Sequence, residues 1–376
     1  MTVRRLRAFG ETIFGVMTAE AERHNAINLG QGFPDSDGPP EMLKIAQAEI
    51  ARGNNQCSPP RGVHSLRAAV AATRNVPVDD VLITVGATEA ITATILGLVE
   101  PGAEVIVFEP YYDAYIAAIA LAGATRVPVP LREVGNTWDI DIEAFAAAIT
   151  PKTSMVIINS PHNPTGAVFP AKTLLLLAKV CQEHDLLVLS DEVYENLVFS
   201  PAQHTRFAEL PGMYERTVTA SSAAKSYNAT GWKTGWAIAP PELLEGVMRA
   251  KQFMTYTGAT PFQAAVAHAI EHELQWLKSM TANLATSRDI LTAGLVRAGL
   301  HIHDSLGTFF VVADVNSSTY SNAEEFCRAL PAERGVAAIP ISAFCDNPEP
   351  FSTKVRFAFC KQPDVIREAV KRFTTR

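Results

Sequence analysis

The sequence predicts an α/β fold: a large, doubly wound, mostly parallel sheet with a smaller α+β domain beside it. From about residue 64, short apolar runs alternate with longer helical patterns. The apolar runs are continuous, as in strands that helices cover on both faces, and strand–helix–strand order is typical of parallel sheets. After Pro261 the pattern changes to long helical stretches followed by short β and α pieces, which indicates the second domain.

The elements follow in chain order. Strands are expected at residues 81–85, 105–108, 155–158 and 186–189, with 217–219 and 236–238 added to the same sheet. Helices are expected at 88–99, 113–122, 170–184 and in long stretches over 261–298. We expect the large domain to cover residues 36–270, and the small domain to combine 271–376 with the N-terminal arm, 1–35.

Composition excludes several classes of protein. The 376 residues carry 32 Lys and Arg against 39 Asp and Glu, a formal net charge of −7, so the basic footprint of nucleic-acid binding is absent. The apolar runs are too short for a bilayer, and the basic start, 1–7, precedes Glu11 without an apolar region. The five cysteines form no Cys-x-x-Cys pair and indicate reduced thiols. We expect a cytoplasmic protein without nucleic-acid or membrane partners.

Polar residues at the carboxyl ends of the predicted strands are the candidate site residues, because ligands collect there in parallel sheets. The first are Gly86, Ala87 and Thr88, between a strand and a helix. This junction offers backbone N–H groups and the positive end of a helix dipole to a phosphate. A tight turn with Thr88 as helix N-cap is the alternative, and the segment alone favours it.

Two further strands end in polar residues. The loop at 159–166, with two prolines and a glycine, carries the amides of Asn159 and Asn163, for which a structural Asx turn is the weaker interpretation. Asp191, with Tyr194 three residues later, ends a buried strand. A buried carboxylate is costly unless it meets a positive charge, such as the protonated ring nitrogen of a cofactor. Equally, Asp191 could cap a following helix.

Two basic segments, one around Lys225 and one around Arg356, complete the candidates. Lys225 lies among small residues that leave room for a planar ligand, and a desolvated lysine has a lowered pKa and can form a Schiff base. Ser222 and Lys233 flank it and could serve a phosphate. Arg356 alternates with apolar residues in a short strand, where its planar fork suits a substrate carboxylate. Taken alone, Arg356 is better explained by an internal ion pair.

Together these segments resemble the fold-type-I, pyridoxal-phosphate-dependent aminotransferases of class I and II, over about residues 28–361. The resemblance rests on an Asn-Pro-x-Gly loop, an Asp-Glu-x-Tyr strand end and a Ser-x-x-Lys…Gly-x-x-x-Gly stretch, in that order. Segments 28–35, 220–236 and 338–342 are similar to the kynurenine/glutamine transaminase branch and, more closely, to actinobacterial N-succinyldiaminopimelate aminotransferases. The resemblance implies amino transfer from an L-amino acid to a 2-oxo acid such as 2-oxoglutarate, with N-succinyl-L,L-diaminopimelate in lysine biosynthesis as one possible donor.

The resemblance also implies roles for the matching residues. Lys225 would bind pyridoxal 5'-phosphate and shuttle the proton, and Asp191 would pair with the ring nitrogen. Around the ring, Asn163 and Tyr194 would hydrogen-bond the phenolic oxygen, and Tyr112 would stack on the face. The phosphate would be held by Gly86, Ala87, Thr88, Ser222 and Lys233. The substrate would be held by Phe14, Gly32, Asn159, Asn163 and Arg356. A homodimer with shared active sites is implied in the same way.

One departure and several alternatives remain. Cys57 stands where the family usually has a tyrosine that reaches the phosphate from the neighbouring subunit, so we expect looser cofactor retention. A cysteine-conjugate β-lyase or a decarboxylase would use the same residues. A transcription-regulator sensor would need a DNA-binding module, for which we expect no room before Asn28, and a binding protein would lack the Schiff base. The cation for a distal carboxylate stays open among Arg4, Arg5, Arg7, Arg23 and Lys251.

Overall fold

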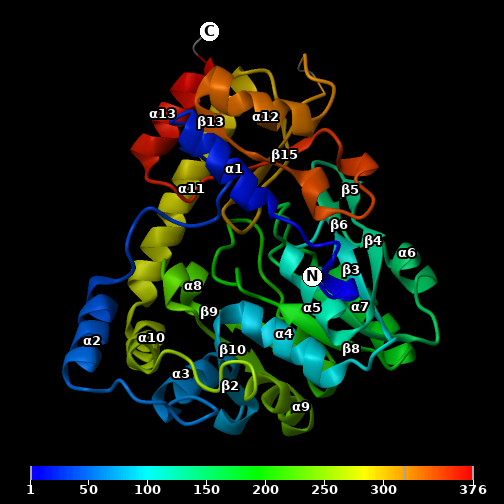
Figure 1. Ribbon diagram of the computed structural model, residues 1–376, viewed down its shortest axis with the longest axis vertical. Coiled ribbons are helices and arrows are strands. Elements are labelled where there is room, and N and C mark those ends of the chain that lie inside the picture. Colours follow the sequence, from blue (N-terminus) through cyan, green and yellow to red (C-terminus); the bar gives the residue numbers. More distant parts are fainter. Residues whose placement is uncertain (1, 317–318, 375–376) are drawn as a thin grey trace.

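The computed structural model describes residues 2–316 and 319–374. A seven-stranded sheet lies at the centre of the larger part of the molecule (Figure 1). Its strand order is β2-β10-β9-β8-β7-β3-β4, and β10 alone runs antiparallel to its neighbours. The strands are β2 (Val81–Val85), β3 (Glu104–Glu109), β4 (Thr125–Pro130), β7 (Thr153–Asn159), β8 (Leu187–Asp191), β9 (Thr217–Ser222) and β10 (Thr234–Ile238). The predicted doubly wound, mostly parallel sheet is confirmed.

Each predicted strand is present in this sheet, and β4 is the one strand of the seven that was not predicted from the sequence. Strand β4 is partly exposed and contains Pro128 and Pro130. It lies at the edge of the sheet, where a missing backbone donor costs little. Its mixed, proline-containing sequence therefore lacks the continuous apolar run by which the central strands were recognised.

Helices cover both faces of this sheet. One face carries α4 (Gly86–Leu98), α5 (Asp113–Ala122) and α9 (Pro241–Lys251), whose apolar residues join one core cluster with β3, β7 and β8. The opposite face carries α3 (His64–Arg74), α6 (Ile142–Ala147), α7 (Ala171–Glu183) and α10 (Thr260–His272). This double cover explains why the central strands are apolar on both sides.

A smaller sheet of four strands lies in the upper part of Figure 1. Its order is β11 (His301–Ile302), β12 (Phe310–Asp314), β15 (Lys354–Ala358) and β14 (Ile339–Pro340). Around it lie α1 (Ile13–Arg23), α11 (Leu274–Arg297), α12 (Ala323–Arg334) and α13 (Pro363–Thr374). Strand β1 (Ile27–Asn28) pairs in parallel with β13 (Val336–Ala337), so the N-terminal arm joins the C-terminal part. The domain boundaries given above stay a prediction.

The remaining elements are short or peripheral. They are α2 (Pro40–Ala51), the hairpin of β5 (Arg132–Val134) and β6 (Thr137–Asp139), and α8 (Ala223–Ser226). All five cysteines are free: Cys181, Cys327 and Cys360 are buried, whereas Cys57 is exposed. In the part of the chain that the structure describes, we find no helix with the length and apolar character needed to cross a membrane.

Candidate active site

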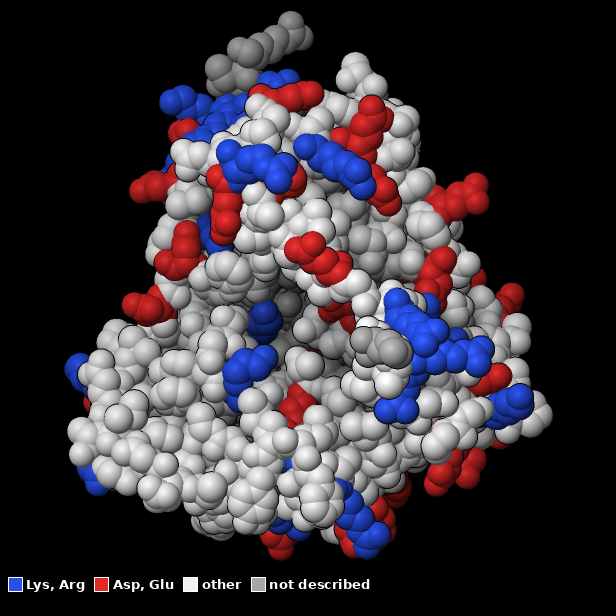
Figure 2. All heavy atoms as spheres, viewed as in Figure 1, with Lys and Arg blue, Asp and Glu red and all other residues white. Residues whose placement is uncertain are grey.

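A cavity of about 280 Å³ lies at the carboxyl ends of the strands of the large sheet. Figure 2 shows a hollow in the centre of one face of the molecule, with basic side chains inside it. Four polar positions reach the cavity from strand ends: Gly86 after β2, Asn159 from β7, Asp191 from β8 and Ser222 from β9. The strand-end rule that selected these residues therefore located the cavity.

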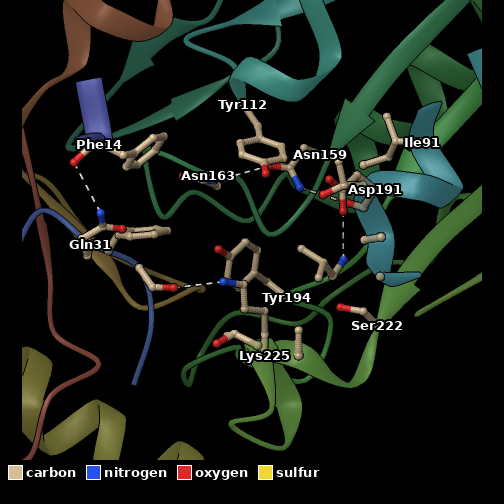
Figure 3. A pocket seen from close by; sticks show the side chains of 18 of the residues that line it. Phe14, Gln31, Ile91, Tyr112, Asn159, Asn163, Asp191, Tyr194, Ser222 and Lys225 are labelled. Atoms are coloured by element: carbon tan, nitrogen blue, oxygen red, sulfur yellow. Dashed lines mark hydrogen bonds between the residues drawn. The ribbon is translucent and has the colours of Figure 1, made fainter. Parts of the chain in front are cut away.

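The structure brings together every residue that the sequence analysis singled out for this site. The cavity is lined by Phe14, Gly32, Gly86, Ala87, Thr88, Tyr112, Asn159, Asn163, Asp191, Tyr194, Ser222, Lys225, Lys233 and Arg356. Figure 3 shows how the labelled members of this set surround the open space. Among the described residues, none of the cations offered for a distal carboxylate lines it.

Six residues that line the cavity were not predicted from the sequence. They are Gln31, Ile91, Val193, Ala224, Thr230 and Phe310. Gln31 adjoins the predicted Gly32, and its amide donates to Thr18 Oγ1 at 2.7 Å. Phe310 comes from β12 of the smaller sheet. It lies far in sequence from the strand ends of the large sheet, so no sequence pattern connected it with the site. Gly32 is glycine because a Cβ there would lie 2.6 Å from the Phe310 ring.

The turn at Gly86 forms the end of the cavity that is suited to bind an anion. Helix α4 begins at Gly86, which has a φ of +72°, and its N-cap is Val85. The alternative in which Thr88 caps the helix is therefore wrong: Thr88 lies inside the first turn. The positive φ favours glycine at this position, and a Cβ on Gly86 would lie 3.5 Å from Lys233 Nζ, so the lysine ammonium lies close to the start of the helix. Helix dipole and ammonium together favour a bound phosphate.

Asp191 provides the buried acid of the cavity. Its Oδ2 accepts a hydrogen bond from Tyr115 Oη at 2.6 Å, and its Oδ1 accepts one from the Val193 backbone N–H at 3.1 Å. Burial raises its pKa from 3.8 to about 6, although both hydrogen bonds oppose that shift. Residues 193–196 form turns and no helix follows β8 directly, so Asp191 caps no helix. Among the described residues, no cation forms a salt bridge with it.

Lys225 lines the same cavity, in the four-residue helix α8. Its Nζ donates to the Gly32 carbonyl at 3.0 Å and lies 5.1 Å from the centre of the Phe309 ring. Burial is the largest cause that lowers the pKa of Lys225 from 10.5 to about 8, and the positive charges of Arg356 and Lys233 contribute in the same direction. The lowered pKa increases the fraction of Lys225 that is a neutral, nucleophilic amine near neutral pH.

Arg356 forms the third charged feature, and Asn163 and Asn159 position it. Arg356 Nη1 donates to Asn163 Oδ1 at 3.0 Å, and Nη2 donates to the Gly30 carbonyl at 2.7 Å. The Asn159 amide donates to the Asp191 carbonyl and accepts from the Asn163 backbone, so it links β7 to β8. No described carboxylate forms the internal ion pair that was the alternative for Arg356, and its buried Nε has no partner in the structure.

Aromatic rings surround these charges. Tyr112 precedes α5 and lies across the open space from Lys225 in Figure 3. The Tyr194 ring packs edge-on against Phe309, and burial raises the pKa of its hydroxyl above the ordinary value. Phe14 and Phe310 stand 5.4 and 4.0 Å from the Arg356 guanidinium carbon, measured to the ring centres. Stacking of this kind holds a guanidinium flat and leaves its edge available to a carboxylate.

The donor set fits a planar ligand with a phosphate at one end and a cationic nitrogen at the other. The helix start with Lys233 suits the phosphate, and the buried Asp191 carboxylate lacks a cation that such a nitrogen would supply. Lys225 and the unpartnered Arg356 Nε complete the arrangement with a nucleophile and a carboxylate-binding group.

Comparisons with known proteins agree with this geometry. The model of the family "Aminotransferase class I and II" matches residues 24–373. The solved structure of N-succinyldiaminopimelate aminotransferase from Mycobacterium tuberculosis superposes with a TM-score of 0.98 at 51% identity, covering 100% of this chain and 99% of that one. The chain belongs to the class I and II aminotransferases, has fold type I, and is an aminotransferase.

Two further relatives have other named activities. The methionine aminotransferase of Escherichia coli is 37% identical, over 98% of this chain and 96% of the relative. Mouse kynurenine–oxoglutarate transaminase 3 is 34% identical, over 98% of this chain and 89% of the relative. The comparisons therefore agree on amino transfer and differ in the amino acid that these proteins are named for.

Proposed function

We propose that this aminotransferase uses pyridoxal 5'-phosphate held by the residues described above. The observation that carries the proposal is that Lys225, Asp191 and Arg356 line one cavity, with the start of α4 at its edge. Lys225 would bind the cofactor aldehyde, Asp191 would face the ring nitrogen, and the α4 start with Ser222 and Lys233 would hold the phosphate. Asn163 and Tyr194 would hydrogen-bond the ring oxygen, and Tyr112 would cover the ring face.

The protein residues then supply positioning and proton transfer. The bound cofactor provides a protonated ring that accepts the electron pair of a broken bond at the substrate Cα. Arg356 fixes the substrate carboxylate, which turns the Cα–H bond toward Lys225. Once the substrate's amino group has replaced it at the aldehyde carbon, Lys225 would be a free amine with a lowered pKa and would take the proton from Cα and return it on the cofactor side. Asp191 keeps the ring nitrogen protonated because its buried charge needs a cation.

For the substrate, we propose N-succinyl-L,L-diaminopimelate as amino donor and 2-oxoglutarate as acceptor, in lysine biosynthesis. The named activity of the Mycobacterium tuberculosis relative, at 51% identity over the full chain, supports this choice. A cytoplasmic homodimer with shared active sites is part of the same proposal. Cys57 is exposed and lies outside the cavity lining of the described chain, which suits a position that faces a partner subunit.

The second candidate is transamination of an uncharged amino acid such as kynurenine, glutamine or methionine. The observation that favours it is the lining around Arg356, where Phe14 and Phe310 are aromatic and Gln31 is uncharged. The described lining has Lys225, Lys233 and Arg356 as its cations, and each already has a role. A distal carboxylate would therefore take its cation from outside this lining.

The proposal is tested with the purified chain loaded with pyridoxal 5'-phosphate. Borohydride should reduce the cofactor onto Lys225, and a tryptic digest should locate it there. Lys225→Ala should lose the trapped label, and its kcat should fall by at least about three orders of magnitude. A label that persists on the Lys225→Ala protein contradicts the assignment. A panel of donors and oxo acids then ranks the substrates, and release of pyruvate and ammonia without an acceptor would indicate a β-lyase.

A further inference from the structure

We propose that Tyr115 is a positioning residue that holds the two groups between which the cofactor ring lies: the Asp191 carboxylate and the Tyr112 ring. This inference rests on the proposed function, because it concerns how the protein controls the cofactor's ring nitrogen. Tyr115 itself is absent from the cavity lining, so it acts through its two neighbours.

The first contact is with the acid. Tyr115 Oη donates to Asp191 Oδ2 at 2.6 Å, a short hydrogen bond to a charged group. The Val193 backbone N–H occupies Oδ1. With one donor on each oxygen, the carboxylate cannot rotate about its own axis without breaking a bond. The carboxylate lone pairs that these two donors leave free therefore keep a fixed orientation. Because Asp191 lines the cavity, a ring nitrogen bound there can reach them.

The second contact of Tyr115 is with the Tyr112 ring. The Tyr115 ring meets the Tyr112 ring edge-on, with centres 5.7 Å apart and planes at 89°. Tyr112 directly precedes α5 and Tyr115 lies in its first turn, three residues later. Residues at this spacing lie on the same side of a helix, so one local element sets both positions. Tyr115 is 3% exposed, and packing leaves it little freedom to move.

The hydrogen bond also has an electrostatic effect. Burial favours a neutral Asp191, and the Tyr115 hydroxyl opposes it by stabilising the carboxylate form. A proton shared between Asp191 and a ring nitrogen is therefore displaced toward the nitrogen. The other titratable groups around Asp191 are Tyr112, Glu192, Tyr194 and Lys225.

The test compares Tyr115→Phe with Tyr111→Phe, both loaded with pyridoxal 5'-phosphate that carries ¹⁵N in the ring. Tyr111 is a matched control: it is also 3% exposed, lies in the same segment, and its hydroxyl interacts with Asp346 instead of Asp191. Solid-state NMR reports the protonation of the ring nitrogen across a pH series. A hydrogen bond to a charged group corresponds to about one pH unit or more, so Tyr115→Phe should lower the deprotonation pH by about that amount.

Activity gives a second readout of the same variants. We expect kcat of Tyr115→Phe to fall about ten-fold with little change in KM, because the lost hydrogen bond acts on the chemical step. Tyr111→Phe should match the wild type in both ring protonation and kcat. If Tyr115→Phe behaves like Tyr111→Phe, the inference is overturned.

A third variant covers the case in which Tyr115→Phe does not fold. Replacement of Tyr115 by 3-fluorotyrosine keeps the shape and makes the phenol a stronger donor, so the deprotonation pH of the ring nitrogen should rise. An unchanged or lower pH overturns the inference. A wild-type protein that takes up no cofactor would instead contradict the proposed function, and the two failures are therefore distinguishable.

Discussion

Asp191 and Glu192 are consecutive buried carboxylates at the end of β8, and their surroundings differ completely. Glu192 accepts from Arg74 Nη1 at 2.8 Å and from the Phe207 backbone, and His204 lies 3.2 Å away. Burial alone would raise the pKa of Glu192, but Arg74 and His204 together lower it below its usual value. Asp191 has only neutral donors on its oxygens, and its pKa is raised to about 6.

The difference separates a completed structural network from a group that still lacks its cation. Arg74 also binds Glu195 at 2.7 Å, so the network around Glu192 has its cation within the fold. Asp191 faces the cavity instead. Burial of a carboxylate without a cation is unfavourable for the protein alone and becomes favourable when a cationic ligand arrives. Adjacent residues can therefore serve stability and function separately.

The largest expected effect is on the side of Asp191. In Asp191→Asn the cofactor's ring nitrogen loses its anionic partner, and loss of one member of a buried ion pair corresponds to about 3–5 kcal/mol. We expect kcat/KM to fall by about a hundred- to several-thousand-fold, measured by steady-state kinetics. Glu192→Gln is the control, since Glu192 lies outside the cavity lining. Equal losses in both variants would contradict the separation of roles.

The next largest effect is expected on the free energy of unfolding, from the ion-pair network around Glu192. Arg74→Met removes the arginine from the buried Glu192 and from the partly buried Glu195, and it should lower the free energy of unfolding by about 3–5 kcal/mol. Urea denaturation measures this change. Arg249→Met breaks the surface pair with Glu245 and should cost at most about 0.5 kcal/mol. A cost for Arg74→Met as small as this would show that the buried network adds no stability.

The smallest effect is on the pH dependence of the cofactor-free protein. The pKa of Asp191 rises from 3.8 to about 6 on folding, so its ionisation destabilises the fold as pH increases through this window. Asp191→Asn should therefore raise the free energy of unfolding at pH 7 by up to about 3 kcal/mol, with no gain below about pH 4.

Glu192→Gln should show the opposite sign in the same experiment. The lowered pKa of Glu192 means that its ionised form stabilises the fold above its unfolded pKa, and this contribution is lost as pH falls. The variant should be less stable than the wild type at pH 7, and the difference should shrink in acid. Urea denaturation of the cofactor-free chains at both pH values decides the matter. The same sign for both variants would refute the comparison.

Much of the cavity could be predicted because its polar residues follow strands. Asn159, Asp191 and Ser222 each end a strand, and parallel strands bring their carboxyl ends to one edge. Residues that reach the site from other elements follow no such sequence pattern and could not be predicted. Tyr115 is one tyrosine in an apolar helix, and Phe310 lies in the smaller sheet, yet one holds Asp191 and the other supports Arg356.

The sequence by itself determined the doubly wound sheet, most residues of the cavity and the resemblance to aminotransferases, because periodicity and motifs are local properties of the chain. Tertiary structure decided the state of each charge. Asp191 and Glu192 are adjacent acids at a strand end in the sequence, and only folding gives one Arg74 and the other Tyr115. The reason is that pKa and burial depend on neighbours through space, which come from distant parts of the chain.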